Sequence, residues 1–375
     1  ARRRGHAALL AGRLDEGLEA LREAVRLEPG SAGAWTNLGA ILRKRGEHAL
    51  AVEAQRRANA LAPEDLAILG NLGNALQDAD LLEEALEIRR EVARRAPERP
   101  EARSLLSVTL RSLGRLDEAI AAAEAGLALA PDHPELTVQR AVSRLAKGDW
   151  EGGLADYVRR WEIGEIDKPP LSDPEWEGEP LAGRRILVLP EQGHGDTVLM
   201  ARFLPLLKAT GAAETILAVK APLARLLGRP EGVDRVVRAG APKPRADFVV
   251  HMVDLPRLLP FDPAAPPPAP RLVIPADSRA RARAIVAPFD GRLKVGVVWS
   301  GSVDYKANFK RSFGPDRFQP LLGIPGVQLF SLYKGPLLQE FRASGLSALI
   351  VDAGGDDRDF ADAAALAQVM DLVIG

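Results

Sequence analysis

Residues 35–63 have the sequence WTNLGAILRKRGEHALAVEAQRRANALAP, and residues 69–97, LGNLGNALQDADLLEEALEIRREVARRAP, match them 34 positions further along the chain. The match extends in both directions, because a proline recurs with the same spacing at Pro29, Pro63, Pro97 and Pro131. A turn residue keeps the same register as Gly12, Gly46, Asp80, Gly114 and Gly148. Proline cannot continue a helix and glycine often ends one, so each unit is predicted to be a pair of helices.

Small and apolar residues also recur inside the units. The second unit has Trp35, Leu38, Gly39, Leu42, Ala51 and Ala58, and the third has Leu69, Leu72, Gly73, Leu76, Ala85 and Val92. These positions resemble the tetratricopeptide repeat motif, which implies a superhelix of stacked helix pairs over residues 1–165. The small residue at Gly39, Gly73 and Ser107 lets the two helices of a unit approach each other.

The resemblance implies that the first helices of the units form a concave face. Asn37 and Asn71 occupy equivalent positions on that face. They resemble the start of the asparagine ladder with which O-linked N-acetylglucosamine transferases hold an extended peptide, although the ladder breaks at Leu105. A protein partner on the array is therefore expected. The alternative is that both amides only cap or solvate helix surfaces.

The sequence pattern changes after the repeats. Residues 166–183 are rich in proline and acidic residues and are predicted to be a connector, and a new domain is predicted to begin at Arg184 with the buried strand of residues 186–189. Further strands are predicted at 215–219, 235–237, 248–251, 295–299, 327–332, 348–351 and 372–374. Alternation with helices indicates an α/β fold, with two Rossmann-like domains in tandem at residues 184–275 and 276–375.

The loop after the first predicted strand contains Glu191, Gln192, Gly193, His194, Gly195 and Asp196. Open α/β sheets bind ligands beyond the carboxyl ends of their strands, which makes this loop a candidate site. We expect Asp196 to be the N-cap of the following helix, where the helix N-terminus would keep its carboxylate ionised. The alternative is that Asp196 only caps the helix while the glycines make the turn.

Five blocks of sequence occur in this region: EQGHGDTVLMARFLPLLK, VGVVWSGS, KRSF, FSLYKG and DFADAAALAQVMDLVIG. In order and spacing they resemble the heptosyltransferase-like family 9 of glycosyltransferases, including members with tetratricopeptide repeats. The resemblance implies a GT-B-like fold and an inverting, metal-independent transfer of a hexose or heptose from a nucleotide-sugar to a hydroxyl group of a protein or glycan-precursor acceptor. It also implies that Asp196 is the general base, and His194 ranks below it as a second candidate.

The departing nucleoside diphosphate needs positive charge or backbone amides, which this fold supplies without a metal. The expected donor-binding residues are Ser300, Gly301, Lys310, Arg311, Ser312 and Lys334. Asp356, Asp357 and Asp359 raise the alternative of a metal site. They fit better as the cap and first-turn acids of the helix predicted at residues 360–368.

The totals limit the remaining function classes. Fifty Lys and Arg residues against fifty-one Asp and Glu leave a net charge of −1, which argues against a nucleic-acid binder. There is no cysteine, and no apolar run is long enough to span a membrane, so a cytoplasmic location is expected.

The family resemblance further implies a phosphate-binding segment after Gly375. We therefore expect the second domain to be incomplete and this chain to transfer sugar poorly or not at all. The alternative function is a non-catalytic tetratricopeptide interaction scaffold with a degenerate glycosyltransferase-like module.

Overall fold

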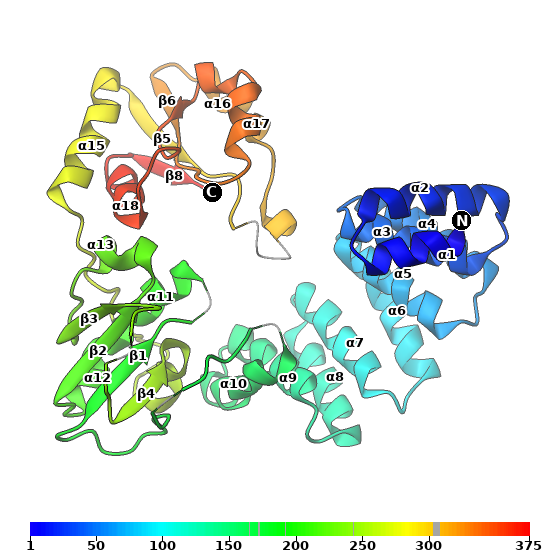
Figure 1. Cartoon of the computed structure of the whole chain (residues 1–375), viewed down its shortest axis with the longest axis horizontal. Helices are drawn as coiled ribbons and strands as arrows, with labels where there is room; N and C mark the ends of the chain where they lie inside the picture. Colours follow the sequence, from blue (N-terminus) through cyan, green and yellow to red (C-terminus); the bar gives the residue numbers. More distant parts are fainter. Residues whose placement is uncertain (165, 172, 192, 243, 303–307) are drawn as a thin grey trace. The chain divides into compact units, whose positions relative to one another are not determined.

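The computed structural model describes residues 1–375 apart from positions 165, 172, 192, 243 and 303–307 and the side chains of Phe309 and Lys310. The chain divides into two compact units, Ala1–Lys168 and Pro169–Gly375. The first unit is helical, and the second contains two parallel sheets (Figure 1).

Antiparallel helix pairs make up the first unit. The first helices of the pairs are α1 (Arg2–Leu10), α3 (Ala32–Lys44), α5 (Leu66–Asp78), α7 (Pro100–Ser112) and α9 (Pro134–Lys147). The second helices are α2 (Leu14–Leu27), α4 (His48–Leu61), α6 (Leu82–Arg95), α8 (Leu116–Leu129) and α10 (Trp150–Tyr157), and the 3₁₀ helix η1 (Val158–Ile163) follows. The predicted helix pairs are thus confirmed.

The recurring turn and proline residues set the ends of these helices. Gly46 and Gly114 have φ values of 78° and 73°, in the left-handed region that glycine enters without steric cost. Asp80 takes the same place with φ of 60° and is the one residue other than glycine with positive φ among those described. Ala62, which precedes Pro63, is no longer helical: its φ is −145° and its ψ is 69°, as expected of a residue before proline.

The second unit contains a first sheet in the order β3-β2-β1-β4 and a second sheet in the order β7-β6-β5-β8, with all neighbouring strands parallel. The strands of the first sheet are β1 (Arg185–Leu189), β2 (Glu214–Val219), β3 (Arg235–Arg238) and β4 (Phe248–His251). Those of the second sheet are β5 (Leu293–Val297), β6 (Val327–Ser331), β7 (Val351–Asp352) and β8 (Leu372–Ile374).

Helices and 3₁₀ segments connect the strands. In the first half of the unit they are α11 (His194–Met200), η2 (Ala201–Phe203), α12 (Leu204–Ala209), η3 (Ala221–Leu223), α13 (Ala224–Leu227), η4 (Met252–Asp254) and α14 (Leu255–Leu258). In the second half they are α15 (Ala276–Val286), η5 (Ala287–Phe289), η6 (Asn308–Arg311), η7 (Pro315–Phe318), α16 (Gln319–Leu322), α17 (Leu338–Ala343), η8 (Leu346–Ala348) and α18 (Phe360–Gln368).

The two faces of the first sheet are buried differently. Ile186, Val188 and Leu217 face a core to which the helices α12, α13 and α14 contribute leucines. Leu187 and Ala218, on the other face, pack with residues of irregular segments, among them Leu171 and Ala246. Both faces are therefore apolar, which explains the continuous apolar run of β1.

One predicted strand has different bounds in the structure. Residues 348–350 were expected in a strand that ended at Val351, but residues 346–348 form η8 and the strand β7 consists of Val351 and Asp352 alone. Leu349 is 58% exposed, so part of the apolar run that suggested a buried strand lies in a turn.

Within the described part of the chain, no helix combines the length and the apolar character needed to cross a lipid bilayer.

Candidate functional site

Asn37 on α3 and Asn71 on α5 lie at equivalent positions of two successive units, and both side chains are half-buried. Neither amide makes a hydrogen bond within the residues that the structure describes. The predicted break in the ladder is present, since α7 has the half-buried Leu105 at this position. Two amide groups on neighbouring first helices are thus available to a ligand.

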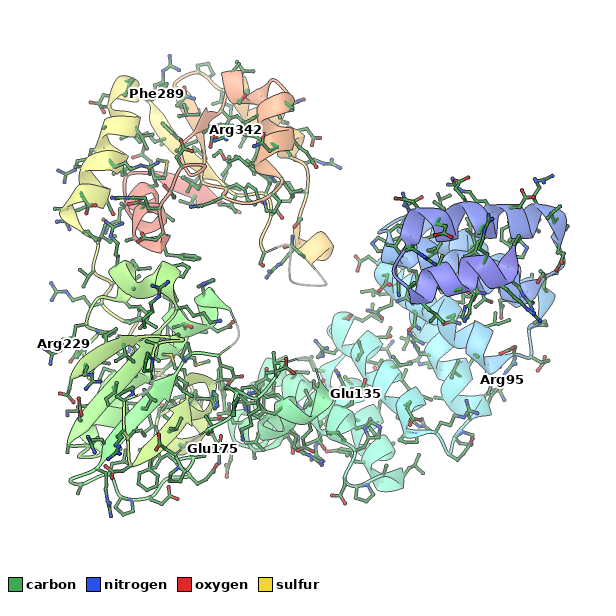
Figure 2. All side chains as sticks on the ribbon, viewed as in Figure 1. Arg95, Glu135, Glu175, Arg229, Phe289 and Arg342 are labelled. Atoms are coloured by element: carbon green, nitrogen blue, oxygen red, sulfur yellow. The ribbon has the colours of Figure 1, made fainter. Side chains whose placement is uncertain are left out.

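Polar side chains near the ends of the first helices bond to the next unit. Arg43 Nε donates to Asp78 Oδ2 over 2.7 Å, and Gln77 Nε2 donates to Ser112 Oγ over 3.1 Å. Further along, Ser104 Oγ donates to Glu135 Oε1 over 3.1 Å; Glu135 is labelled on α9 in Figure 2. These bonds connect neighbouring first helices directly.

A second set of contacts joins the two helices inside the second and third units. Gln55 Nε2 donates to the carbonyl of Thr36 over 3.0 Å, and 34 residues later Arg89 donates from NH1 to the carbonyl of Gly70 over 3.1 Å. A Cβ on Gly39 would lie 2.4 Å from Gln55 Nε2, so the small residue predicted there makes room for this bond.

Arg89 is 2% exposed, and its second guanidinium nitrogen donates to Asn74 Oδ1 over 2.5 Å. Burial, together with repulsion from Arg43, lowers the pKa of Arg89 to about 10. Sequence reasoning missed Gln55 and Arg89. The available signal was a polar residue at the same position of two successive units.

In the first sheet, the loop after β1 carries the predicted base. Asp196 is half-buried, and its Oδ2 accepts a hydrogen bond from the backbone N–H of Gly193 over 2.8 Å. The predicted N-cap assignment was wrong: Gly193 is the N-cap of α11, and Asp196 lies three residues into the helix. The Asp196 carboxylate is therefore bonded to Gly193 of the same loop.

The other residues of this loop differ in accessibility. Glu191 is buried, Gly195 has open space where a side chain would lie, and Gln192 lies outside the described residues. The ring of His194 lies 5.0 Å from that of Phe360 on α18, measured between centroids. Burial, and secondarily the charge of Lys220, lowers the pKa of His194 below its ordinary value.

In the second sheet, the expected donor-binding residues at 300, 301, 311 and 312 form one cluster around Asn308. Asn308 Nδ2 donates to Ser300 Oγ over 3.0 Å, and its Oδ1 accepts from the backbone N–H of Gly301 over 3.1 Å. Arg311 Nε lies 3.3 Å from the same Oδ1, and Ser312 Oγ lies 3.0 Å from Ser300 Oγ. Sequence reasoning missed Asn308, because nothing in its local pattern marks it.

Two further cations were expected at the donor site, Lys310 and Lys334. The side chain of Lys310 lies outside the described residues. Lys334 donates from Nζ to the backbone carbonyl of Asp357, so its ammonium group has a partner within the protein. Of the expected cations whose side chains are described, Arg311 is the one that shares the cluster with Ser300 and Asn308.

The three aspartates proposed as an alternative metal site have different partners. Asp359 caps α18, as predicted, by accepting from Ala361 N over 2.9 Å. Asp357 is buried and pairs with Arg281 over 2.6 Å, while the side chain of Asp356 is 87% exposed. Among the described residues, no group of three or more His, Asp or Glu side chains is placed to hold a metal ion.

Asp357 has a perturbed pKa despite its cationic partner. Burial raises the pKa of this carboxyl group to about 6, and the hydrogen bond from Arg281 opposes that rise only in part.

Comparison with known proteins identifies the helical unit. A tetratricopeptide repeat model matches residues 2–65, 71–134 and 109–165. The protein FlbA of Caulobacter vibrioides is 32% identical over 267 residues, which cover 64% of this chain and 43% of FlbA. The chain thus spans less than half the length of this relative, and the match extends beyond Lys168 into the second unit.

Several solved structures are also similar to part of the chain. A MamA from MSR-1 is 26% identical with a TM-score of 0.38, and the match covers 44% of this chain and 94% of the MamA chain. A MamA from Desulfovibrio magneticus RS-1 is 20% identical with a TM-score of 0.39, and the match covers 44% of this chain and 93% of that MamA chain. YrrB, described as a tetratricopeptide protein with an unusual peptide-binding site, is 20% identical with a TM-score of 0.37, and covers 43% and 82%.

The recurring helix pairs, the close contacts at the small residues and the family match agree with one another. The N-terminal unit of this chain is an array of tetratricopeptide repeats.

Proposed function

We propose that the chain is a protein-interaction scaffold whose repeat array binds an extended peptide segment along its first helices. The observation that carries this proposal is the pair of amides at Asn37 and Asn71, which have no hydrogen-bond partner among the described residues. An asparagine amide can donate and accept at once, as a peptide backbone does, and therefore suits recognition of the main chain.

The neighbouring contacts support this role. Arg43 and Gln77, near the ends of α3 and α5, are engaged with Asp78 and Ser112, which hold neighbouring units together. These side chains therefore bond within the array, whereas the two asparagines have no hydrogen-bond partner among the described residues. Their repetition one unit apart matches a ligand that is itself repetitive, such as a peptide backbone.

The test uses linear peptides selected from a random displayed library against the full chain. We expect the double variant Asn37→Ala, Asn71→Ala to bind the selected peptides about tenfold or more weakly, because each lost hydrogen bond costs about 0.5–1.5 kcal/mol. Glu87→Ala is the matched control, since its side chain is 76% exposed on a second helix. Failure to select any peptide, or equal binding by the double variant, would count against the proposal.

A second candidate function is sugar transfer from a nucleotide-sugar by the second unit, with Asp196 as general base. It is supported by the order of the two parallel sheets, which is in each case that of half a doubly wound fold, and by a glycine-containing loop after each central first strand. The cluster around Asn308 supplies the cation Arg311 for a diphosphate.

Calorimetry with a panel of nucleoside diphosphates tests this candidate. Arg311→Ala is expected to weaken binding of the preferred diphosphate about tenfold, while the exposed Arg317→Ala leaves it unchanged. Asp196→Asn should retain diphosphate binding and abolish any transfer to an acceptor. If no diphosphate binds at millimolar concentration, the second unit does not act on nucleotide-sugars and the scaffold function stands alone.

A further inference from the structure

The first sheet has an unusual connection between its third and fourth strands. β3 ends at Arg238 and β4 begins at Phe248, and no helix occurs in the described residues of the intervening segment. Parallel strands are usually joined through a helix that covers one face of the sheet. Here Leu187 and Val237 on that face pack with irregular segments, including Leu171 and Ala246.

A cavity of about 230 Å³ lies on this face, at the carboxyl ends of the strands. Leu187 and Leu189 of β1, Ala218 of β2 and Val237 of β3 contribute to its apolar lining. The volume equals that of roughly eight water molecules. The turn at Ala239 to Ala241 adds only small residues to the wall, so the cavity stays open.

Among the described residues that line the cavity, the two charged ones are both cations. Lys220 follows β2 directly and Arg238 ends β3, so both stand at the carboxyl edge of the sheet. Arg238 is exposed and makes no ion pair within the described part of the chain. An apolar floor with positive charge at one end matches a ligand that is apolar at one end and negatively charged at the other.

We propose that this cavity binds a small amphiphilic anion, with an apolar body of a few carbon atoms against Leu187, Ala218 and Val237 and a carboxylate or phosphate at Lys220 and Arg238. The site is separate from the asparagines of the repeat array and from the cluster around Asn308. It also lies next to the predicted catalytic loop, because Pro190, which directly follows β1, is one of its lining residues.

The experiment measures binding of hexanoate and hexyl phosphate to the full chain by calorimetry, with hexan-1-ol, acetate and inorganic phosphate as the separated halves of the ligand. We expect at least one six-carbon anion to bind about tenfold more tightly than every one of the three halves, since both ends of the cavity are then occupied. The anion that binds better identifies the head group. Equal binding of hexan-1-ol, or no binding of either anion, would overturn the proposal.

Variants place the ligand within the cavity. The double variant Lys220→Gln, Arg238→Gln should reduce the affinity of the preferred anion about tenfold, to that of hexan-1-ol. Arg235→Gln is the matched control, because Arg235 lies at the opposite end of the same strand and pairs with Glu214 at 3.8 Å. Ala218→Leu should fill the floor and weaken all six-carbon probes. Should that variant fail to fold, the charge variants decide alone, and unchanged anion binding in the double variant would refute the site.

Discussion

At the scale of single residues, Lys220 links the cavity of the first sheet to the loop after β1. Burial is the main cause of the lowered pKa of His194, and the positive charge of Lys220 is the second cause. Removing that charge should therefore raise the pKa of His194 toward, but not above, the ordinary value, since burial remains.

This expectation can be measured in Lys220→Gln by NMR titration of the His194 ring proton. The other four histidines of the chain serve as internal references. A pKa of His194 that stays constant or falls would show that Lys220 does not act on this ring.

A second prediction concerns how the stability contributed by Asp357 depends on pH. Its pKa is raised to about 6 in the folded chain, mainly by burial, from an ordinary value of 3.8. Between pH ~4 and about 6, Asp357 thus stays protonated in the folded state but is ionised in the unfolded state. The stability that Asp357 contributes is therefore present below pH ~4 and lost as the pH rises through about 6.

We expect the chain to lose on the order of 1 kcal/mol of stability from Asp357 between pH 5 and 7. Chemical denaturation at the two pH values measures this loss, and Asp357→Asn should abolish it. Asp356→Asn is the control, because that side chain is largely exposed. Asp362, whose pKa is lowered chiefly by Arg358, should not contribute in this range. Equal pH dependence of the two variants would contradict the assignment.

At the scale of elements, the turn between the helices of a repeat is set by backbone geometry alone. Gly114 has φ of 73° with open space around its Cα, and Asp80 occupies the equivalent turn with φ of 60°. A residue with a Cβ is strained in this region, whereas glycine is not.

We therefore expect Asp80→Gly to raise stability by up to about 1 kcal/mol and Gly114→Ala to lower it by about 1 kcal/mol. Thermal melting of the full chain, followed by the helical circular dichroism signal, compares both variants with the parent. A decrease in the melting temperature of Asp80→Gly would mean that a side-chain contact of Asp80 outweighs the backbone strain.

The elements also show where sequence reasoning succeeds. The helix pairs were predictable because proline and glycine act through local backbone sterics, and the spacing of 34 made the pattern visible. The strand at 348–351 was misplaced because a short apolar run does not determine whether its residues pair or turn. The position of Asp196 in α11 was missed because Gly193 can begin a helix without a side-chain cap.

The candidate sites were less predictable than the fold. Asn37 and Asn71 follow from the repeat register, but Asn308 depends on contacts away from its neighbours in sequence: its side chain donates to Ser300, eight positions earlier, and its backbone carbonyl accepts from Ser312. The cavity in the first sheet borders the segment between β3 and β4, whose described residues form no helix, and it becomes apparent only once the strand order is known.

At the scale of the whole molecule, each hydrophobic core lies within one of the two units. The clusters around Leu21, Leu106 and Leu136 contain only residues of the first unit, and those of the sheets contain only residues of the second. Each unit is also large enough to bury a core of its own.

Residues 1–168 and 169–375, produced separately, should therefore each fold. Circular dichroism should report a helical spectrum for the first fragment and a mixed spectrum for the second, each with cooperative melting. Loss of cooperative melting in either fragment would show that this unit needs contacts that its own core does not supply.

The constant period of the first unit has a consequence for how such a protein can change length. Neighbouring helix pairs bond to one another through equivalent positions, as from Arg43 to Asp78 and from Gln77 to Ser112. A duplicated stretch of 34 residues could thus form the same hydrogen bonds with the units before and after it. An insertion of any other size would break the register. An array of this kind can therefore gain one complete helix pair in a single genetic step.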